Sequence, residues 1–184
     1  MSDSFIKEDC VKDFMFEHSI LDRILLIFEG IIKNHNKIID CKYLKVLILI
    51  LKIFIENHHE KMEELYVFPS MKSDNNKKLV KILIEEHKLS RILTSKILKY
   101  CDNNDVYNKN IEFIKSLLQK FIDMYRYHES HENLEIYPEF EKNITKKEYV
   151  KINSLVEKNE KLILGKIKIK NIIQIIIKIE KILF

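Results

Sequence analysis

The stretch HHEKMEELYVFP, residues 58–69, sets the interpretation of this 184-residue chain, because its outline returns in the second half as YHESHENLEIYP, residues 127–138. Each stretch contains a histidine, a glutamate four residues later and a proline six residues after that glutamate. A Glu-His pair precedes each stretch, at residues 17–18 and 86–87, and the two pairs are offset in the sequence by the same amount as the two stretches. The sequence therefore indicates two related halves.

The composition around this repeat favours long helices. The chain contains two glycines and two prolines, and 46% of its residues are hydrophobic. Tight turns and phosphate-binding loops depend on glycine, so this composition excludes most β-sandwiches, barrels and dinucleotide-binding folds. Apolar residues recur at helical spacing between polar connections at 72–76 and 102–105. The four long predicted helices cover about residues 14–32, 43–68, 78–100 and 107–131. A shorter helix is predicted to start at the capping box Thr145–Glu148, and a last helix to follow Gly165 and cover residues 169–183.

These helices predict an all-α protein, an up-down-up-down four-helix bundle with additional C-terminal helices. We expect a single domain, residues 1–184, in which the bundle with the repeat spans about residues 12–141 and the C-terminal helices about residues 146–184. The two prolines, Pro69 and Pro138, should each end or kink a helix just after its repeated stretch, because proline cannot donate to the helical hydrogen-bond ladder.

The repeat also predicts that six polar side chains meet in one layer of the bundle. In an antiparallel helix pair, residues equally far from the connecting turn lie at the same height. The four repeated histidines are placed symmetrically about the predicted connections, and a glutamate four residues after a histidine shares its helix face. The six candidate metal ligands are His18, His59, Glu63, His87, His128 and Glu132.

A pair of metal ions explains why these six side chains would be placed inside a bundle. Unpaired polar groups are costly to bury, and buried charges cost more. Imidazole and carboxylate ligands with open coordination positions suit iron or manganese. By symmetry, one ion lies near the candidate ligands of each half, with Glu63 and Glu132 as candidate bridges between the two ions.

Other polar residues flank the six candidates. His58 directly precedes His59 and is expected to join the site, to lie at the edge of the pocket or to lie at the surface. Glu60 recurs as Glu129, so one of them is an extra ligand, or both are surface residues. Of the remaining histidines, His131 is expected near the pocket or at the surface and His35 is expected to be exposed. Tyr66, Tyr127 and Tyr137 are expected in the core, with a hydrogen bond to the site as the alternative for each.

Charge, cysteine content and hydropathy argue against several other classes of protein. The net charge is +4 with alternating signs, typical of a solvated helical surface, so we expect no nucleic-acid partner. Cys10, Cys41 and Cys101 are widely spaced and are expected to be reduced. The N-terminus lacks the apolar core of a signal peptide, and no apolar run reaches the ~20 residues that span a bilayer. We therefore expect a cytoplasmic protein without a membrane partner.

At these residues the chain resembles the hemerythrin-like, or HHE cation-binding, domain family. Residues 58–69 resemble its His-His-x-Lys-Glu-Glu-x-x-Leu-Phe-Pro segment, Glu86-His87 its third-helix Glu-His motif, and residues 128–138 its His-x-x-x-Glu segment before the last proline. The resemblance covers about residues 14–141 and implies a non-haem di-iron centre. Oxygen-carrying members use five histidines, whereas this chain offers four in the repeat.

We therefore expect a protein that binds two iron ions, or manganese, whose open positions take O₂, NO or peroxide. The expected role is sensing, scavenging, or stress and iron–sulfur repair. Two alternatives stay open. A ferritin-type di-iron oxidoreductase would use Glu56-x-x-His59, although Tyr125 replaces Glu56 in the second half. A metal-free interaction module, or a homodimer, would use the apolar C-terminal helix at 172–184.

Overall fold

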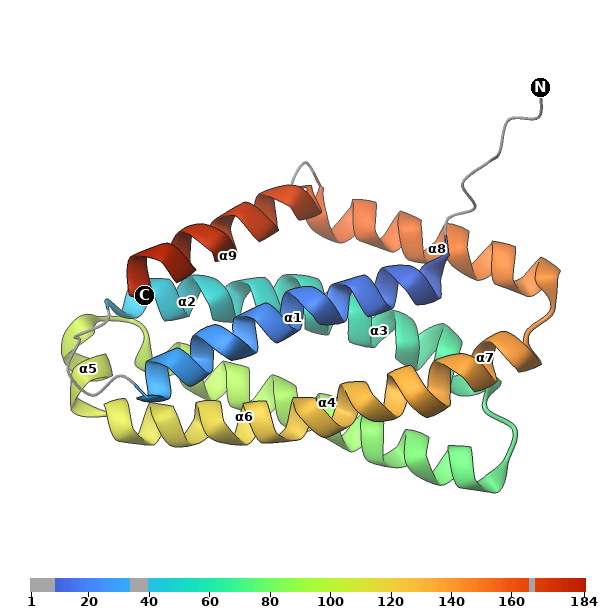
Figure 1. Ribbon diagram of the computed structural model, residues 1–184, viewed down its shortest axis with the longest axis horizontal. Coiled ribbons are helices and arrows are strands. Elements are labelled where there is room, and N and C mark those ends of the chain that lie inside the picture. Colours follow the sequence, from blue (N-terminus) through green and yellow to red (C-terminus); the bar gives the residue numbers. More distant parts are fainter. Residues whose placement is uncertain (1–8, 34–39, 166–167) are drawn as a thin grey trace.

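The computed structural model describes residues 9–33, 40–165 and 168–184, and the regular secondary structure in these ranges is entirely helical (Figure 1). The all-α prediction is therefore confirmed. No helix in the described ranges is both long and apolar enough to cross a bilayer. All three cysteines lie in these ranges, where they are buried and unpaired.

The first two long helices agree closely with the prediction. Helix α1 spans Cys10–Lys33. The second helix is continuous, but its winding changes along its length. It consists of α2, Cys41–Ile50; the π-helical η1, Leu51–His59; α3, Glu60–Met62; the π-helical η2, Glu63–Val67; and the 3-10 turn η3, Phe68–Ser70.

The next two long helices differ from the prediction at their N-terminal ends. Helix α4 spans Asp74–Tyr100, because the Ser73 side chain accepts a hydrogen bond from the backbone N–H of Asn76 and caps the first turn. Part of the polar segment expected to be a connection is therefore helical. The predicted helix 107–131 is divided at Asn110 into α5, Asn104–Lys109, and α6, Ile111–His131. Beyond α6 follow the π-helical η4, Glu132–Ile136, and α7, Tyr137–Asn143.

Each proline follows one of two matching π-helical segments. The residue before each proline donates its backbone N–H to the backbone carbonyl oxygen of the glutamate that begins the segment. Phe68 donates to Glu63 in η2, and Tyr137 donates to Glu132 in η4. Wide turns of this kind are frequent at functional sites. The helix ends directly after Pro69, as predicted. The helix continues as α7 after Pro138, because proline is tolerated in a first helical turn. Of the two predicted outcomes, an end or a kink, the end does not occur at Pro138, and the kink stays a prediction.

The four long helices enclose a common interior. Helix α1 packs against α6 and η1, and α4 packs against α6, η1 and α2. Helix α8, Lys146–Leu164, packs on η1 and α1, and α9, Ile169–Leu183, packs on α1 and α2 (Figure 1). Helix α9 buries Ile172, Ile176, Ile179 and Leu183 in the chain's own core. This apolar face, which we expected to support a homodimer, is therefore covered within the chain.

Both glycines lie where a side chain would not fit or would be strained. Gly165 ends α8 with a φ of 58°, in the left-handed region that favours glycine. It separates α8 from α9, as predicted. Gly30 lies on α1 beneath the Phe184 ring, where an added Cβ would be 2.0 Å from the nearest ring carbon. Gly30 thus allows the C-terminal end of the chain to pack closely on α1.

A polar layer separates two apolar clusters in the interior. On α1, Phe14 belongs to the smaller cluster and Ile20 to the larger one, and His18 lies between them in the sequence. On the other three long helices each repeated histidine also lies between residues of the two clusters, in the same order on α4 and in the reverse order on the second helix and the α6–η4 helix. The helices therefore carry the candidate site at the junction of two well-packed cores.

The capping box at the start of α8 gives a test of the fold. The Thr145 side chain accepts a hydrogen bond from the backbone N–H of Glu148, and the Glu148 carboxylate accepts one from the backbone N–H of Thr145. We expect Thr145→Ala to lower the free energy of unfolding by about 1 kcal/mol in urea titrations followed by circular dichroism. Thr145→Ser keeps the hydroxyl and should retain most of the stability. Equal stability of Thr145→Ala and the unmodified protein would contradict the assignment.

Candidate metal centre

Six buried side chains from the four long helices meet at the polar layer. They come from α1, the second helix, α4, and the α6–η4 helix: His18, His59, Glu63, His87, His128 and Glu132. They form two overlapping groups of four, within each of which one potential ligand atom per residue lies within 4.8 Å of the others. Glu63 and Glu132 belong to both groups. The structure therefore brings together all six residues predicted from the repeat, whose role as ligands stays a prediction.

The imidazole Nε2 atoms and the carboxylate oxygens face one another. The Nε2 atoms of His18 and His59 are 3.0 Å apart, and those of His87 and His128 are also 3.0 Å apart. Glu132 places Oε2 at 3.2 Å from the Nε2 of His18 and Oε1 at 3.1 Å from that of His128. Oε2 of Glu63 is 3.5 Å from the Nε2 of His59 and 3.6 Å from that of His87.

The outer nitrogen, Nδ1, of each histidine contacts an oxygen acceptor. Glu17 accepts from His59 at 2.7 Å, and Glu86 accepts from His128 at 2.9 Å. The other two contacts are His87 Nδ1 to Glu64 at 2.9 Å and His18 Nδ1 to the Asn133 side-chain oxygen at 3.1 Å. An acceptor at Nδ1 places the proton on that nitrogen, so the Nε2 lone pair points inward.

These four acceptors support the candidate site, and none of them was predicted from the sequence. A signal was present, because Glu17 and Glu86 occupy equivalent positions of the repeat and each precedes a candidate ligand. Glu64 and Asn133 also occupy equivalent positions, but their side chains differ in type. The repeat therefore identifies Glu17 and Glu86 as equivalent residues, but it does not identify Glu64 and Asn133.

The arrangement fits a pair of cations. Oε2 of Glu63 and both carboxylate oxygens of Glu132 are buried and find no hydrogen-bond donor among the described residues. Inward lone pairs and carboxylate oxygens repel one another unless positive charge lies between them. Two ligand atoms that are each about 2.1 Å from one ion, at right angles, are about 3.0 Å apart. The observed separations between facing atoms are of this size.

The pKa shifts show where protons bind when no cation is present. Burial lowers the pKa of His128, but the adjacent Glu132 carboxylate outweighs burial and holds this pKa well above its usual value. Burial raises the pKa of Glu132, but His128 outweighs it, so this pKa lies well below its usual value. Burial, together with the charge of Glu132, raises the pKa of Glu63. Burial also lowers the pKa of His59 to about 4, despite Glu17.

Two aromatic rings stack on histidines of the site. Tyr137 stacks on His18 with a centroid distance of 5.8 Å, and Phe68 stacks on His87 at 5.6 Å. The Tyr137 hydroxyl donates a hydrogen bond to Oε1 of Glu63 at 2.6 Å. Tyr137 thus fulfils both roles considered for it, because its ring is buried in the smaller apolar cluster and its hydroxyl makes a hydrogen bond to the site.

The other histidines lie outside the six-residue cluster. His58 is buried, but its Nδ1 donates to the side-chain oxygen of Asn159 at 2.9 Å and its Nε2 is 3.2 Å from Glu17. The structure thus places His59, rather than His58, in the cluster. His131 lies partly exposed beside Glu135, with 2.8 Å between Nδ1 and Oε1. His35 lies outside the described residues.

Glu60 and Glu129 are both buried, so the surface role considered for them is wrong. Glu60 accepts a hydrogen bond from the Tyr125 hydroxyl and pairs with Arg91 at 2.9 Å. Burial raises the pKa of Glu129 to about 8, and its Oε1 finds no hydrogen-bond donor among the described residues. Of the other tyrosines expected in the core, Tyr66 is half-buried and Tyr127 is 72% exposed, so the core assignment is wrong for Tyr127.

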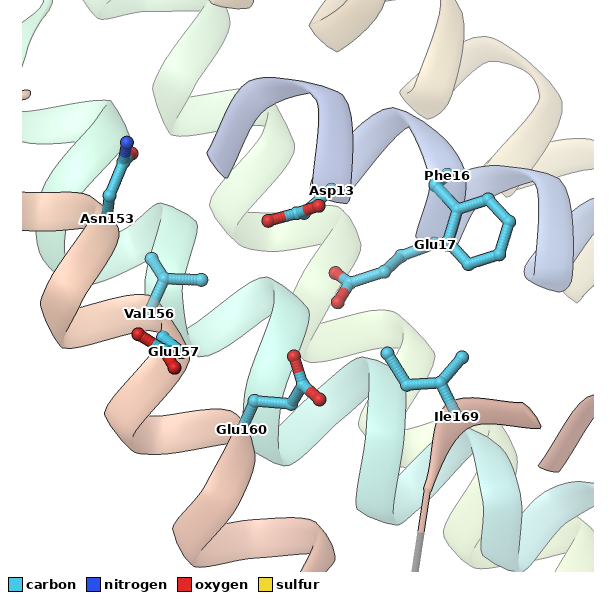
Figure 2. Close-up of a pocket in the computed structure, with 8 residues that line it drawn as sticks. All are labelled: Asp13, Phe16, Glu17, Asn153, Val156, Glu157, Glu160 and Ile169. Atoms are coloured by element: carbon cyan, nitrogen blue, oxygen red, sulfur yellow. The ribbon is translucent and has the colours of Figure 1, made fainter. Parts of the chain in front are cut away.

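A cavity of about 230 Å³ lies on the outer side of the first half, between α1 and α8 (Figure 2). Figure 2 shows the carboxylates of Glu17 and Glu160 pointing toward the space between these helices. Asp13 and Glu157 also line the cavity. Glu17 therefore lies between this acidic cavity and His59.

Comparison with known proteins agrees with this geometry. Residues 11–140 match the family model described as hemerythrin HHE cation-binding domain. Proteins of Mycobacterium tuberculosis and Mycobacterium bovis, both described only as uncharacterized, are 26% identical to the chain over 174 residues, which covers 92% of this chain and 68% of theirs. No solved structure shows a significant match.

Proton and metal binding should compete at this site. The raised pKa values of His128 and Glu63 mean that both groups keep protons at a higher pH than free side chains do. A bound cation displaces these protons, so the apparent affinity should rise with pH by up to about tenfold per pH unit for each displaced proton. Titrations with Mn²⁺ between about pH 6 and pH 8 measure this rise. An affinity that does not change with pH would contradict proton displacement.

The Nδ1 partners give a second test. Removing such a partner typically lowers metal affinity about 10- to 100-fold. We expect this loss for Glu86→Ala, because Glu86 accepts the hydrogen bond from His128 Nδ1 and its side chain is only partly buried. The matched control is Glu135→Ala, which removes the carboxylate beside the exposed His131 and should leave the affinity for Mn²⁺ unchanged. Equal affinities of the two variants would argue against a role for Glu86.

Proposed function

Because the chain belongs to the hemerythrin HHE cation-binding domain family, we propose that it binds two iron ions, with manganese as an alternative metal, through His18, His59, Glu63, His87, His128 and Glu132. The open coordination positions of the bound ions would bind or react with O₂, NO or peroxide. The proposed role is sensing, scavenging, or stress and iron–sulfur repair.

One observation carries the proposal: two histidine pairs face the same two buried glutamates. Each pair has its Nε2 atoms 3.0 Å apart, and both groups of potential ligands include Glu63 and Glu132. Carboxylate-bridged dinuclear centres in helical bundles are built from the same ligand types. The orphaned carboxylate oxygens support the proposal independently of the family match.

The surrounding residues hold the site in a fixed geometry. The acceptors at Nδ1 fix the orientation of each imidazole, and the apolar clusters on both sides of the layer limit the access of water. When bound, iron supplies redox chemistry and positions for a small ligand. The four-histidine set supports these roles rather than reversible oxygen carriage, for which the sequence resemblance implies five histidines.

The proposal includes the up-down-up-down order of the four long helices. It is supported by the packing of α1 on α6, of α6 on α4, of α4 on η1, and of η1 on α1, which closes a ring of neighbours. Such a ring lets each helix contribute to one internal layer. The division into a bundle at about residues 12–141 and C-terminal helices at about 146–184, within one domain of residues 1–184, belongs to the same proposal.

Three further predictions from the sequence belong to this proposal. We propose a cytoplasmic location, and neither nucleic acid nor a membrane as a partner. A homodimer through α9 would use the residues that this helix leaves exposed, such as Ile175 and Ile182, because its other apolar face is buried within the chain. The oligomeric state is measurable by light scattering.

The two alternative functions have less support. The ferritin-type alternative needs Glu56 as a ligand, but Glu56 accepts hydrogen bonds from Thr94 and Lys52, and the groups of potential ligands found among the described residues do not include it. The metal-free interaction module leaves the facing lone pairs of the polar layer without a cation. We therefore retain the di-iron protein as the proposed function.

Metal analysis after anaerobic purification tests the proposal directly. We expect about two iron ions per chain, and absorption changes on adding O₂ or NO. His59→Ala should lose most of the bound iron, because it removes one inward-facing Nε2 atom. His131→Ala is the matched control and should keep the iron, since His131 lies outside the cluster. Unmodified protein that contains no iron or manganese would support the metal-free module instead.

A further inference from the structure

The site departs from the symmetry of the repeat at Tyr137. Its counterpart in the first half is Phe68, which directly precedes Pro69 as Tyr137 precedes Pro138. Both rings stack on a histidine at nearly the same angle, 19° for Tyr137 on His18 and 21° for Phe68 on His87. Stacking on the histidine therefore does not require a hydroxyl. The hydroxyl of Tyr137 is an addition that one half has and the other lacks.

This hydroxyl donates a hydrogen bond to one carboxylate oxygen of Glu63. Tyr137 donates to Oε1 at 2.6 Å, and Oε2 is left without a hydrogen bond among the described residues. Oε2 is almost equally far from the two halves, at 3.5 Å from the Nε2 of His59 and 3.6 Å from that of His87. Glu63 thus presents a single oxygen to both halves of the site.

Glu132 faces the site differently. Neither of its carboxylate oxygens accepts a hydrogen bond from the described residues. Oε2 is 3.2 Å from the Nε2 of His18, and Oε1 is 3.1 Å from that of His128. Glu132 thus presents one oxygen to each half, and the two glutamates, which the repeat makes equivalent, differ in the number of oxygens that they offer.

On the premise that the site holds two ions, as proposed above, we propose that Tyr137 is a positioning residue that holds Oε1 of Glu63, so that Glu63 offers only Oε2 to the ions and room for a small ligand is kept beside His18. The hydroxyl lies 3.5 Å from the Nε2 of His18, so its effect falls on the first half. Without Tyr137, Oε1 of Glu63 is free to occupy a coordination position itself. Tyr137 then affects the binding of a small ligand without contacting that ligand.

Tyr137→Phe tests this role, because it removes the hydroxyl and keeps the ring. Protein loaded with Co²⁺ reports the coordination number through its visible absorption, and azide probes the open position. We expect Tyr137→Phe to bind Co²⁺, with weaker visible absorption as the coordination number rises. We also expect its affinity for azide to fall by about tenfold or more, the size of effect expected when one hydrogen bond to a charged group is lost.

Tyr149→Phe is the matched control. Tyr149 is partly buried against the smaller apolar cluster, and its hydroxyl donates to Asp9, a carboxylate that belongs to none of the groups of potential ligands. The control removes the same chemical group outside the polar layer, so it should leave the Co²⁺ absorption and the azide affinity unchanged. Circular dichroism confirms that both variants are folded.

The possible results separate this inference from the proposed function. Unmodified protein that binds no Co²⁺ and contains no iron overturns both. Unmodified protein that binds Co²⁺ while Tyr137→Phe matches it in absorption and azide affinity overturns only the role of Tyr137. Equal changes in Tyr137→Phe and Tyr149→Phe would show general loosening of the core and also overturn it. A phenolate-to-iron absorption band in ferric protein that Tyr137→Phe loses would make Tyr137 a ligand, which contradicts a positioning role.

Discussion

The main constraint on this interior is that the folded helices hold histidine and carboxylate lone pairs close together, although these lone pairs repel one another. Four imidazole Nε2 atoms and the carboxylates of Glu63 and Glu132 meet in one buried layer, with facing atoms 3.0–3.8 Å apart. Acceptors at Nδ1 hold the histidine protons on the outside of this layer. Only protons or cations inside the layer relieve the repulsion. The two apolar clusters provide the packing that keeps the helices together despite it.

The six-residue layer could be predicted from the sequence, because a glutamate four residues after a histidine must share its helix face and the repeat supplies this pair twice. A hydrogen bond from a nearby tyrosine was an alternative, but the sequence could not select Tyr137 and Glu63 as its partners, because the direction of each tyrosine side chain depends on how the helices pack. Asn133 was missed because its counterpart is a glutamate. The start of α4 was placed too late because polar residues after Ser73 are typical of turns, yet the Ser73 cap allows them to form the first helical turn.

The C-terminal helices make the surroundings of the two halves unequal. His58 is fully buried and is joined to Asn159 of α8, whereas its counterpart in the second half, Tyr127, is largely exposed. Helix α8 packs on α1 and η1, which carry His18 and His59, two of the proposed ligands (Figure 1). The proposed ligand sets of the two halves therefore match more closely than the surroundings of the two halves do. The difference in surroundings comes from α8, which lies outside the repeat, so it could not be predicted from the repeat.

Unequal burial gives the two halves different routes for hydrogen ions. The carboxylate that accepts the Nδ1 proton of His128 belongs to Glu86, whose side chain is 23% exposed to solvent. The corresponding acceptor for His59 is Glu17, whose side chain is 2% exposed and lies against His58. A proton leaving His128 thus passes to a carboxylate that is itself exposed to bulk water, whereas a proton leaving His59 passes to a carboxylate that is shared by two imidazoles and lines the acidic cavity. Isotope exchange at Nδ1 consequently distinguishes two histidines that the repeat makes alike.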